Sequence, residues 1–157
     1  MKFIVDCMHG KLARKMRIYG YDTAYDASLE DDTILEIARR ERRTIITSDQ
    51  NLIERALSQN INVVRAPLDS DLSRMMKIFK TCGLKPKLKP ESSRCPICNS
   101  TLKKAKKTEV AGVPERILKK RRSFYKCPRC GKVYWKGSHW KRIMDFEETL
   151  KRRLGAS

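Results

Sequence analysis

Two Cys-x-x-Cys pairs in the second half constrain the fold of this 157-residue chain more than any other feature. The first pair is Cys95 and Cys98, and the second is Cys127 and Cys130. Two residues between the cysteines let both sulfurs of a pair face one tetrahedral ion, with Zn–S distances near about 2.3 Å. Four sulfurs fill the coordination sphere, so the zinc would be structural rather than catalytic. The spacing predicts a four-cysteine zinc ribbon with a C-terminal helix over residues 94–157.

The stretch between the two pairs is 28 residues long, which predicts an insertion in the first hairpin of the ribbon. Two disulfides are the alternative, but two close pairs plus two single cysteines are typical of metal binding in a reducing compartment. We therefore expect a cytoplasmic protein, and we expect Cys7 and Cys82 to be small core residues. No apolar run approaches the roughly 18 residues that span a membrane, so no membrane segment is expected.

The first half alternates short apolar runs with helical periods. Strand-like runs lie near residues 3–5, 22–25, 44–47 and 61–64, and the segments between and after them place apolar residues at helical spacing. This alternation predicts an α/β domain with a doubly wound parallel sheet over residues 1–84. Residues 85–93 contain two prolines and lack periodicity, so they are interpreted as a linker.

Acidic residues follow two of the predicted strands. Asp6 closes the first and Asp49 follows the third, and a sheet in the order 2-1-3-4 makes these strands neighbours. Both carboxylates would then lie at the switch point, where open α/β sheets bind ligands. Asp31 and Asp32 begin the helix that leads into the third strand. Asp31 lies on the same side of this helix as its apolar residues, so it is preferred to Asp32 as the partner of Asp6 and Asp49.

Three clustered carboxylates repel one another unless a cation lies between them, so Asp6, Asp31 and Asp49 predict a Mg²⁺ or Mn²⁺ site. Such a site can activate water and neutralise charge on a scissile phosphate. The alternative is helix capping, by Asp31 or Asp32 for one helix and by Asp49 for the next. The sequence leaves both interpretations open.

Positive charge is concentrated in the second half. Residues 91–157 hold 19 Lys and Arg against 6 Asp and Glu, whereas residues 1–90 hold 17 against 12. A polyanion is the expected partner, nucleic acid first and anionic lipid second. Cations and aromatic rings that alternate suit single-stranded nucleic acid. The candidate nucleic-acid-binding residues are Lys119, Lys120, Arg121, Arg122, Trp135 and Trp140. The alternative is a solvated hairpin whose aromatic residues pack in the ribbon core.

A second set of cations begins the helix after Gly10. Lys11 and Arg14 lie in its first turns, where backbone N–H groups and positive side chains together favour a phosphate. A solvated helix face is the alternative.

Several segments resemble a known family. The chain is similar to the C-terminal ribonuclease domain named after the Mut-seven exonuclease. The similar segments are 5–8, 10–14, 20–23 and 47–49, the Asp31-Asp32 helix start, both cysteine pairs and Gly137-Ser138-His139-Trp140. That family joins a PIN-like domain to a zinc ribbon. The resemblance implies a metal-dependent ribonuclease that acts on RNA, with Asp6, Asp31 (or Asp32) and Asp49 as catalytic acids.

PIN nucleases commonly carry a further glutamate on a helix between the first and later aspartates, and only 20 residues separate Gly10 from Asp31 here. The alternative is therefore a non-catalytic RNA-binding or adaptor protein. The ribosomal-RNA maturation endonucleases also join a PIN domain to a zinc ribbon, but residues 137–140 fit the first family better.

Overall fold

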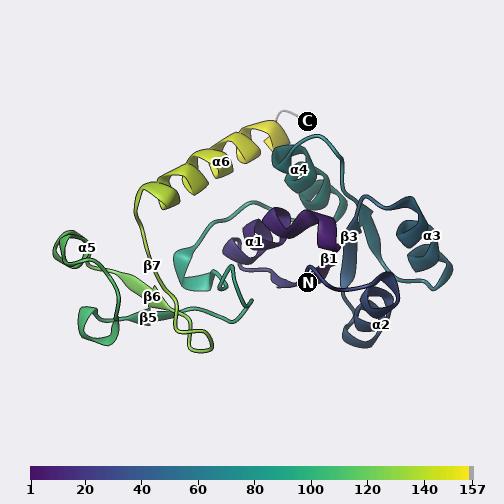
Figure 1. Ribbon diagram of the computed structural model, residues 1–157. Coiled ribbons are helices and arrows are strands. Elements are labelled where there is room, and N and C mark those ends of the chain that lie inside the picture. Colours follow the sequence, from purple (N-terminus) through teal and green to yellow (C-terminus); the bar gives the residue numbers. More distant parts are fainter. Residues whose placement is uncertain (156–157) are drawn as a thin grey trace.

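The computed structural model describes residues 1–155 (Figure 1). The first part contains, in chain order, β1 (Lys2–Val5), α1 (Gly10–Ile18), β2 (Asp22–Ala24), α2 (Asp31–Glu41), β3 (Thr44–Thr47), α3 (Gln50–Ser58), β4 (Val63–Arg65) and α4 (Asp71–Thr81). The second part contains β5 (Lys103–Ala105), α5 (Glu115–Lys120), β6 (Phe124–Lys126), β7 (Val133–Trp135) and the long helix α6 (Ser138–Gly155). Short 3-10 helices lie at Cys7–His9, Pro90–Ser92 and Lys107–Glu109.

The parallel sheet has the predicted strand order. The first is fully parallel in the order β2-β1-β3-β4, and the second is antiparallel in the order β5-β6-β7. Each parallel pair needs a crossover connection, which a helix supplies. The chain turns to the opposite side of β1 after β2, so β1 and β3 flank the switch point. The fold is an α/β unit followed by a four-cysteine ribbon, as the sequence predicts.

Apolar residues cover both faces of the parallel sheet. Phe3 and Val5 point to one face, where they join buried residues of α1 and α4, and Ile4 points to the other, where it joins α2 and α3. This alternation is the period of two expected of a strand that is buried on both sides. The helical layers fix the ends of β1 and β3, and so fix the residues that follow them.

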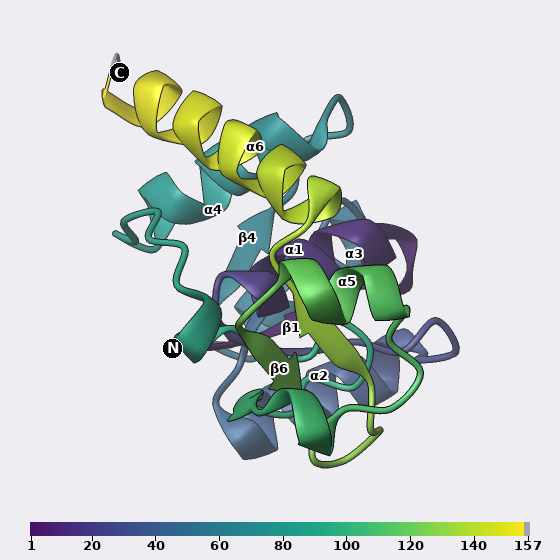
Figure 2. The same ribbon diagram turned by 90° about the vertical axis from the view of Figure 1, so that its left-hand side faces the viewer.

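The ribbon and α6 lie against the parallel-sheet part. Figure 2 shows α6 running alongside α4, and Leu150 of α6 is fully buried in the cluster that contains Phe79. Glu147 is also buried, and its carboxylate accepts a hydrogen bond from the backbone N–H of Leu88 (2.6 Å). Buried Ser93 donates a hydrogen bond to the carbonyl of Ile18 (2.7 Å). No helix within residues 1–155 is long and apolar enough to cross a membrane.

The prediction for Cys7 is wrong. Cys7 is exposed, because the buried run of β1 ends at Asp6 and the chain then turns into a 3-10 helix. Cys82 is half-buried and packs against the core beside α4. A thiol therefore lies next to the first acidic residue of the predicted site.

Candidate active site and zinc centre

Asp6 and Asp49 follow neighbouring parallel strands. Val5 pairs with Ile46 in the register of β1 and β3, so the residues after these strands lie at the same sheet edge. Asp6 is buried, and its Oδ2 accepts a hydrogen bond from Oγ1 of Thr47 (2.8 Å). The carboxylate also bonds to the thiol of Cys7, which raises the pKa of that thiol. The Asp6 side chain is therefore held in place by both strand ends.

Asp49 caps α3, as the capping alternative predicts. One carboxylate oxygen, Oδ1, accepts a hydrogen bond from the N–H of Leu52 (2.8 Å). Its other oxygen has no hydrogen bond within the described part of the chain. Capping and metal binding are therefore compatible at this residue, since each needs one oxygen.

Neither Asp31 nor Asp32 caps α2. The N-cap is Glu30, and its side chain makes no capping hydrogen bond. The Asp32 side chain is 84% exposed and pairs with Arg55, whereas that of Asp31 is 41% exposed and lies 3.9 Å from the same guanidinium. Burial and the negative charges of Asp49 and Asp6 raise the pKa of Asp31. Asp31 is thus the member of the pair that faces the other two acids.

His9 joins the segments that follow β1 and β3. Its Nε2 lies 2.7 Å from Oγ of Ser48, which itself donates to the carbonyl of Ala66 (2.7 Å). Because the single hydroxyl hydrogen of Ser48 is used there, Nε2 of His9 is the donor. Burial lowers the pKa of His9, and the nearby charge of Arg74 lowers it further. His9 therefore stays neutral and positions the loop that carries Asp6.

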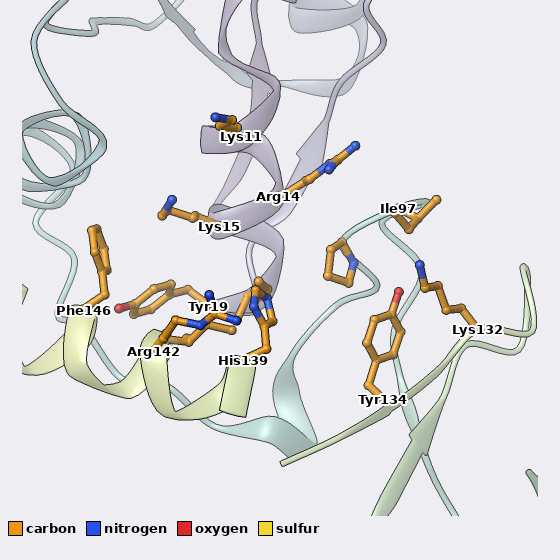
Figure 3. A pocket seen from close by; sticks show the side chains of 13 residues that line it. Lys11, Arg14, Lys15, Tyr19, Ile97, Lys132, Tyr134, His139, Arg142 and Phe146 are labelled. Carbon is orange, nitrogen blue, oxygen red and sulfur yellow. The ribbon is translucent and has the colours of Figure 1, made fainter. Parts of the chain in front are cut away.

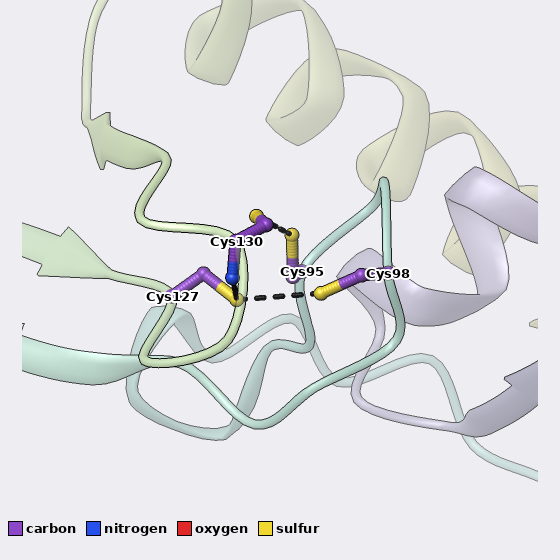
Figure 4. A group of neighbouring side chains, drawn as sticks. All are labelled: Cys95, Cys98, Cys127 and Cys130. Atoms are coloured by element: carbon purple, nitrogen blue, oxygen red, sulfur yellow. Dashed lines mark hydrogen bonds between the residues drawn. The ribbon is translucent and has the colours of Figure 1, made fainter.

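The four cysteines form a compact tetrad (Figure 4). Within residues 1–155 they are the only group of three or more Cys, His, Asp or Glu whose ligand atoms all lie within 4.8 Å of one another. The Sγ atoms of Cys95 and Cys130 are 3.7 Å apart, and those of Cys98 and Cys127 are 3.4 Å apart. A tetrahedral ion with Zn–S bonds of about 2.3 Å requires S···S distances near about 3.8 Å. The cluster therefore fits a structural zinc, and the three aspartates lie more loosely arranged.

Groups around the tetrad contact its sulfurs and shift the thiol pKa values in both directions, down at Cys127 and up at Cys98 and Cys130. The hydroxyl of Tyr134 lies 3.2 Å from Sγ of Cys95, and the N–H of Cys130 donates to Sγ of Cys127 (3.4 Å). Burial alone would raise the pKa of Cys127, but the N–H donors and the neighbouring cysteine thiols lower it. Such outer contacts orient metal ligands and set their basicity. All six cysteines of the chain are free of disulfides, which excludes the disulfide alternative in this structure.

The predicted cations fall into two separate places. Lys119, Lys120, Arg121 and Arg122 are exposed at and after α5, at the end of the ribbon farthest from the parallel sheet (Figure 1). Lys119 pairs with Glu115. Trp135 is half-buried against Phe124, with the ring centroids 6.5 Å apart, and it lines a small cavity of about 100 Å³ together with Trp140. Trp135 thus serves partly as ribbon core, as one alternative predicts.

Lys11 and Arg14 are exposed on α1 and line a cavity of about 610 Å³ between α1, the first cysteine pair and α6 (Figure 3). The same cavity is lined by Tyr19, Lys132 and Arg142, which the sequence analysis did not select. No local pattern identifies these three residues, because they come from three distant segments. They meet only through the docking of α6 and the ribbon onto α1.

One of three comparisons with known proteins gave a match. Comparison with curated proteins gave no match, and comparison with solved structures gave none either. A family model described as the Mut7-C RNAse domain matches residues 1–146 of the 157, a range that includes the three aspartates and all four zinc ligands. The chain therefore belongs to the Mut7-C RNAse domain family.

Proposed function

We propose that this protein hydrolyses RNA phosphodiester bonds with Mg²⁺ or Mn²⁺ held by Asp6, Asp31 and Asp49. The observation that carries the proposal is the register of β1 and β3, which places Asp6 and Asp49 at one sheet edge in a chain of the Mut7-C RNAse domain family. The raised pKa of Asp31, caused by burial and by the charges of Asp49 and Asp6, supports it. Carboxylates that crowd one another in this way are relieved by a divalent cation, and hard cations prefer such oxygen ligands. A carboxylate oxygen of Asp49 without a hydrogen bond is an additional available ligand.

A divalent ion at this edge would activate water and neutralise charge on the scissile phosphate. The chain's own residues supply the remainder of the site. Neutral His9 and Ser48 fix the loops that carry Asp6 and Asp49. Lys11 and Arg14 lie just beyond this loop on α1, where their charges would steer the RNA backbone towards the acids.

One observation favours a second candidate, a non-catalytic RNA-binding protein. Asp6 already accepts hydrogen bonds from Thr47 and Cys7, and Asp49 caps α3, so both carboxylates have structural roles. Such a protein would bind RNA and leave it uncut with either ion. Cleavage assays on the purified chain separate the two candidates directly.

The experiment compares Asp6→Asn with Asp26→Asn. Asp6→Asn keeps the shape of the side chain but removes a charge, so metal-dependent cleavage of single-stranded RNA should fall by at least about a hundredfold. RNA affinity should be unchanged or higher. Asp26 is an exposed carboxylate whose hydrogen bonds go to Ser28, so Asp26→Asn should cut like the native chain. Equal cleavage by both variants would show that Asp6 is not part of the site.

The neighbours Asp31 and Asp32 provide a second comparison. Asp31→Asn should lose cleavage, whereas Asp32→Asn should retain most of it, because the Asp32 side chain faces solvent and Arg55. The reverse result would assign the third ligand to Asp32.

A further inference from the structure

The cavity between α1, the ribbon and α6 has the size of a ligand site. Its volume is about 610 Å³, and binding pockets for small molecules range from about 300 to 1,000 Å³. Figure 3 shows Lys11, Arg14 and Lys15 along α1, with Arg142 on α6 and Lys132 on the ribbon. One nucleotide fits such a space with room for its phosphate.

The charge of the cavity has one sign. Five cations line it and no acidic residue does. Lys15 is paired with Asp71 at 2.7 Å. The other four, which are Lys11, Arg14, Lys132 and Arg142, have no ion pair within residues 1–155. Unneutralised cations around a concave surface concentrate their field there and attract an anion.

Tyr19 borders the cavity and is only 7% exposed. Its hydroxyl has no hydrogen-bond partner within the described residues, but it is buried out of reach of solvent, so a ligand in the cavity does not reach it either. Tyr19 therefore shapes one wall of the cavity, and the cations supply the recognition.

The cavity shares Lys11 and Arg14 with a hollow that begins just after Asp6 in the chain. Lys11 and Arg14 also line a neighbouring hollow of about 550 Å³, together with Cys7 and Met8. Cys7 directly follows Asp6 in the chain. An RNA strand that passes the aspartates would therefore meet Lys11 and Arg14 before it reaches Arg142 and the ribbon.

We propose that this cavity is a nucleotide subsite for a single RNA strand, with phosphates of the strand contacted by Lys11, Arg14, Lys132 and Arg142 around its rim. The inference rests on the proposed function, because it takes RNA as the ligand. Mixed cationic and aromatic surfaces bind single strands in this manner. The ribbon acts here by closing one wall of the subsite, not through the cations at its distant end.

Binding is measured with a fluorescein-labelled oligouridylate. The assay contains neither Mg²⁺ nor Mn²⁺, so cleavage does not interfere.

Arg142→Gln and Lys141→Gln form a matched pair on α6. Both remove one positive charge from an exposed position, but only Arg142 lines the cavity. Affinity for an oligouridylate of about eight nucleotides should fall about fivefold or more with Arg142→Gln and by less than about twofold with Lys141→Gln. Equal losses would mean that charge acts without a defined subsite and would overturn the proposal.

The two proposals fail separately. If the native chain does not cut RNA with either ion but the binding losses follow the expected pattern, the subsite stands and the ribonuclease proposal falls. If the chain cuts RNA but Arg142→Gln binds like the native protein, the subsite falls and the ribonuclease proposal stands.

Discussion

Arg17 is the residue whose replacement most directly tests how the ribbon is attached. It lies in α1, is only 4% exposed, and donates from Nε to the carbonyl of Thr23 (2.9 Å). Its Nη1 donates to the carbonyls of Pro96 and Ile97, at 2.8 and 3.0 Å. These two carbonyls lie between the first two zinc ligands, Cys95 and Cys98. One guanidinium therefore connects α1, β2 and the first cysteine pair.

Arg17→Met keeps an unbranched side chain and removes the three hydrogen bonds. At a net value of about 1 kcal/mol each, the free energy of unfolding should fall by about 3 kcal/mol. The buried carbonyl of Thr23 loses a donor, whereas the Ile97 carbonyl belongs to an exposed residue and can bind water, so the loss should not be much larger. Domains of this size have about 5–15 kcal/mol of stability, so the variant should still fold.

Urea unfolding should be followed by circular dichroism and by zinc release to a chromogenic chelator. Arg17→Met should lower the midpoint of both signals, with zinc released first, because the first cysteine pair has lost its attachment to α1. Arg14→Met is the control, since Arg14 lies on the same helix but is exposed and has no ion pair in the described residues. If Arg17→Met unfolds and releases zinc at the same urea concentrations as Arg14→Met, the attachment argument is refuted.

Three further predictions concern the zinc, the acids and the ribbon's distal cations. Cys127→Ser should release zinc and unfold the β5-β6-β7 sheet while the helical signal of the parallel-sheet part persists; elemental analysis and circular dichroism check this. Asp31→Asn should raise thermal stability at pH 7 without divalent ions, because a raised pKa means that the charged form of Asp31 destabilises the folded state. The gain should vanish below about pH 4, where the carboxyl is protonated, and melting curves at several pH values check this. Neutralising residues 119–122 should flatten the salt dependence of RNA binding by up to about 0.7 per lost phosphate contact, measured by titration at several salt concentrations.

Much of the fold follows from local patterns. A strand that is buried on both faces needs consecutive apolar residues, and it must end where a charge follows, so the sequence around Asp6 predicts both β1 and the position of its carboxylate. The cysteine spacing acts in the same local way, because two residues between ligands decide whether both sulfurs can face one ion. These features depend on neighbours in the chain and can be recognised there.

Features that depend on docking could not be predicted. The sequence places Cys7 beside an apolar run, yet the turn that ends β1 exposes it. The cations at residues 119–122 are recognisable in the sequence because they are consecutive. Lys132 and Arg142 are far apart in the chain, and only the folded structure brings them to the same cavity.

In the proposed subsite, the zinc would contribute to RNA binding through architecture rather than charge. The second cysteine pair of the zinc site lies just before Lys132 in the chain. The first pair flanks two residues whose carbonyls accept hydrogen bonds from Arg17. Structural zinc supplies folding free energy to the loops that carry its ligands, so its loss would release one wall of the cavity. The acidic edge is built on β1 and β3 and would keep its own support from Thr47 and His9. The subsite depends on the ribbon and the acids depend on the sheet, so binding at the cavity should be lost before the acidic site is disturbed.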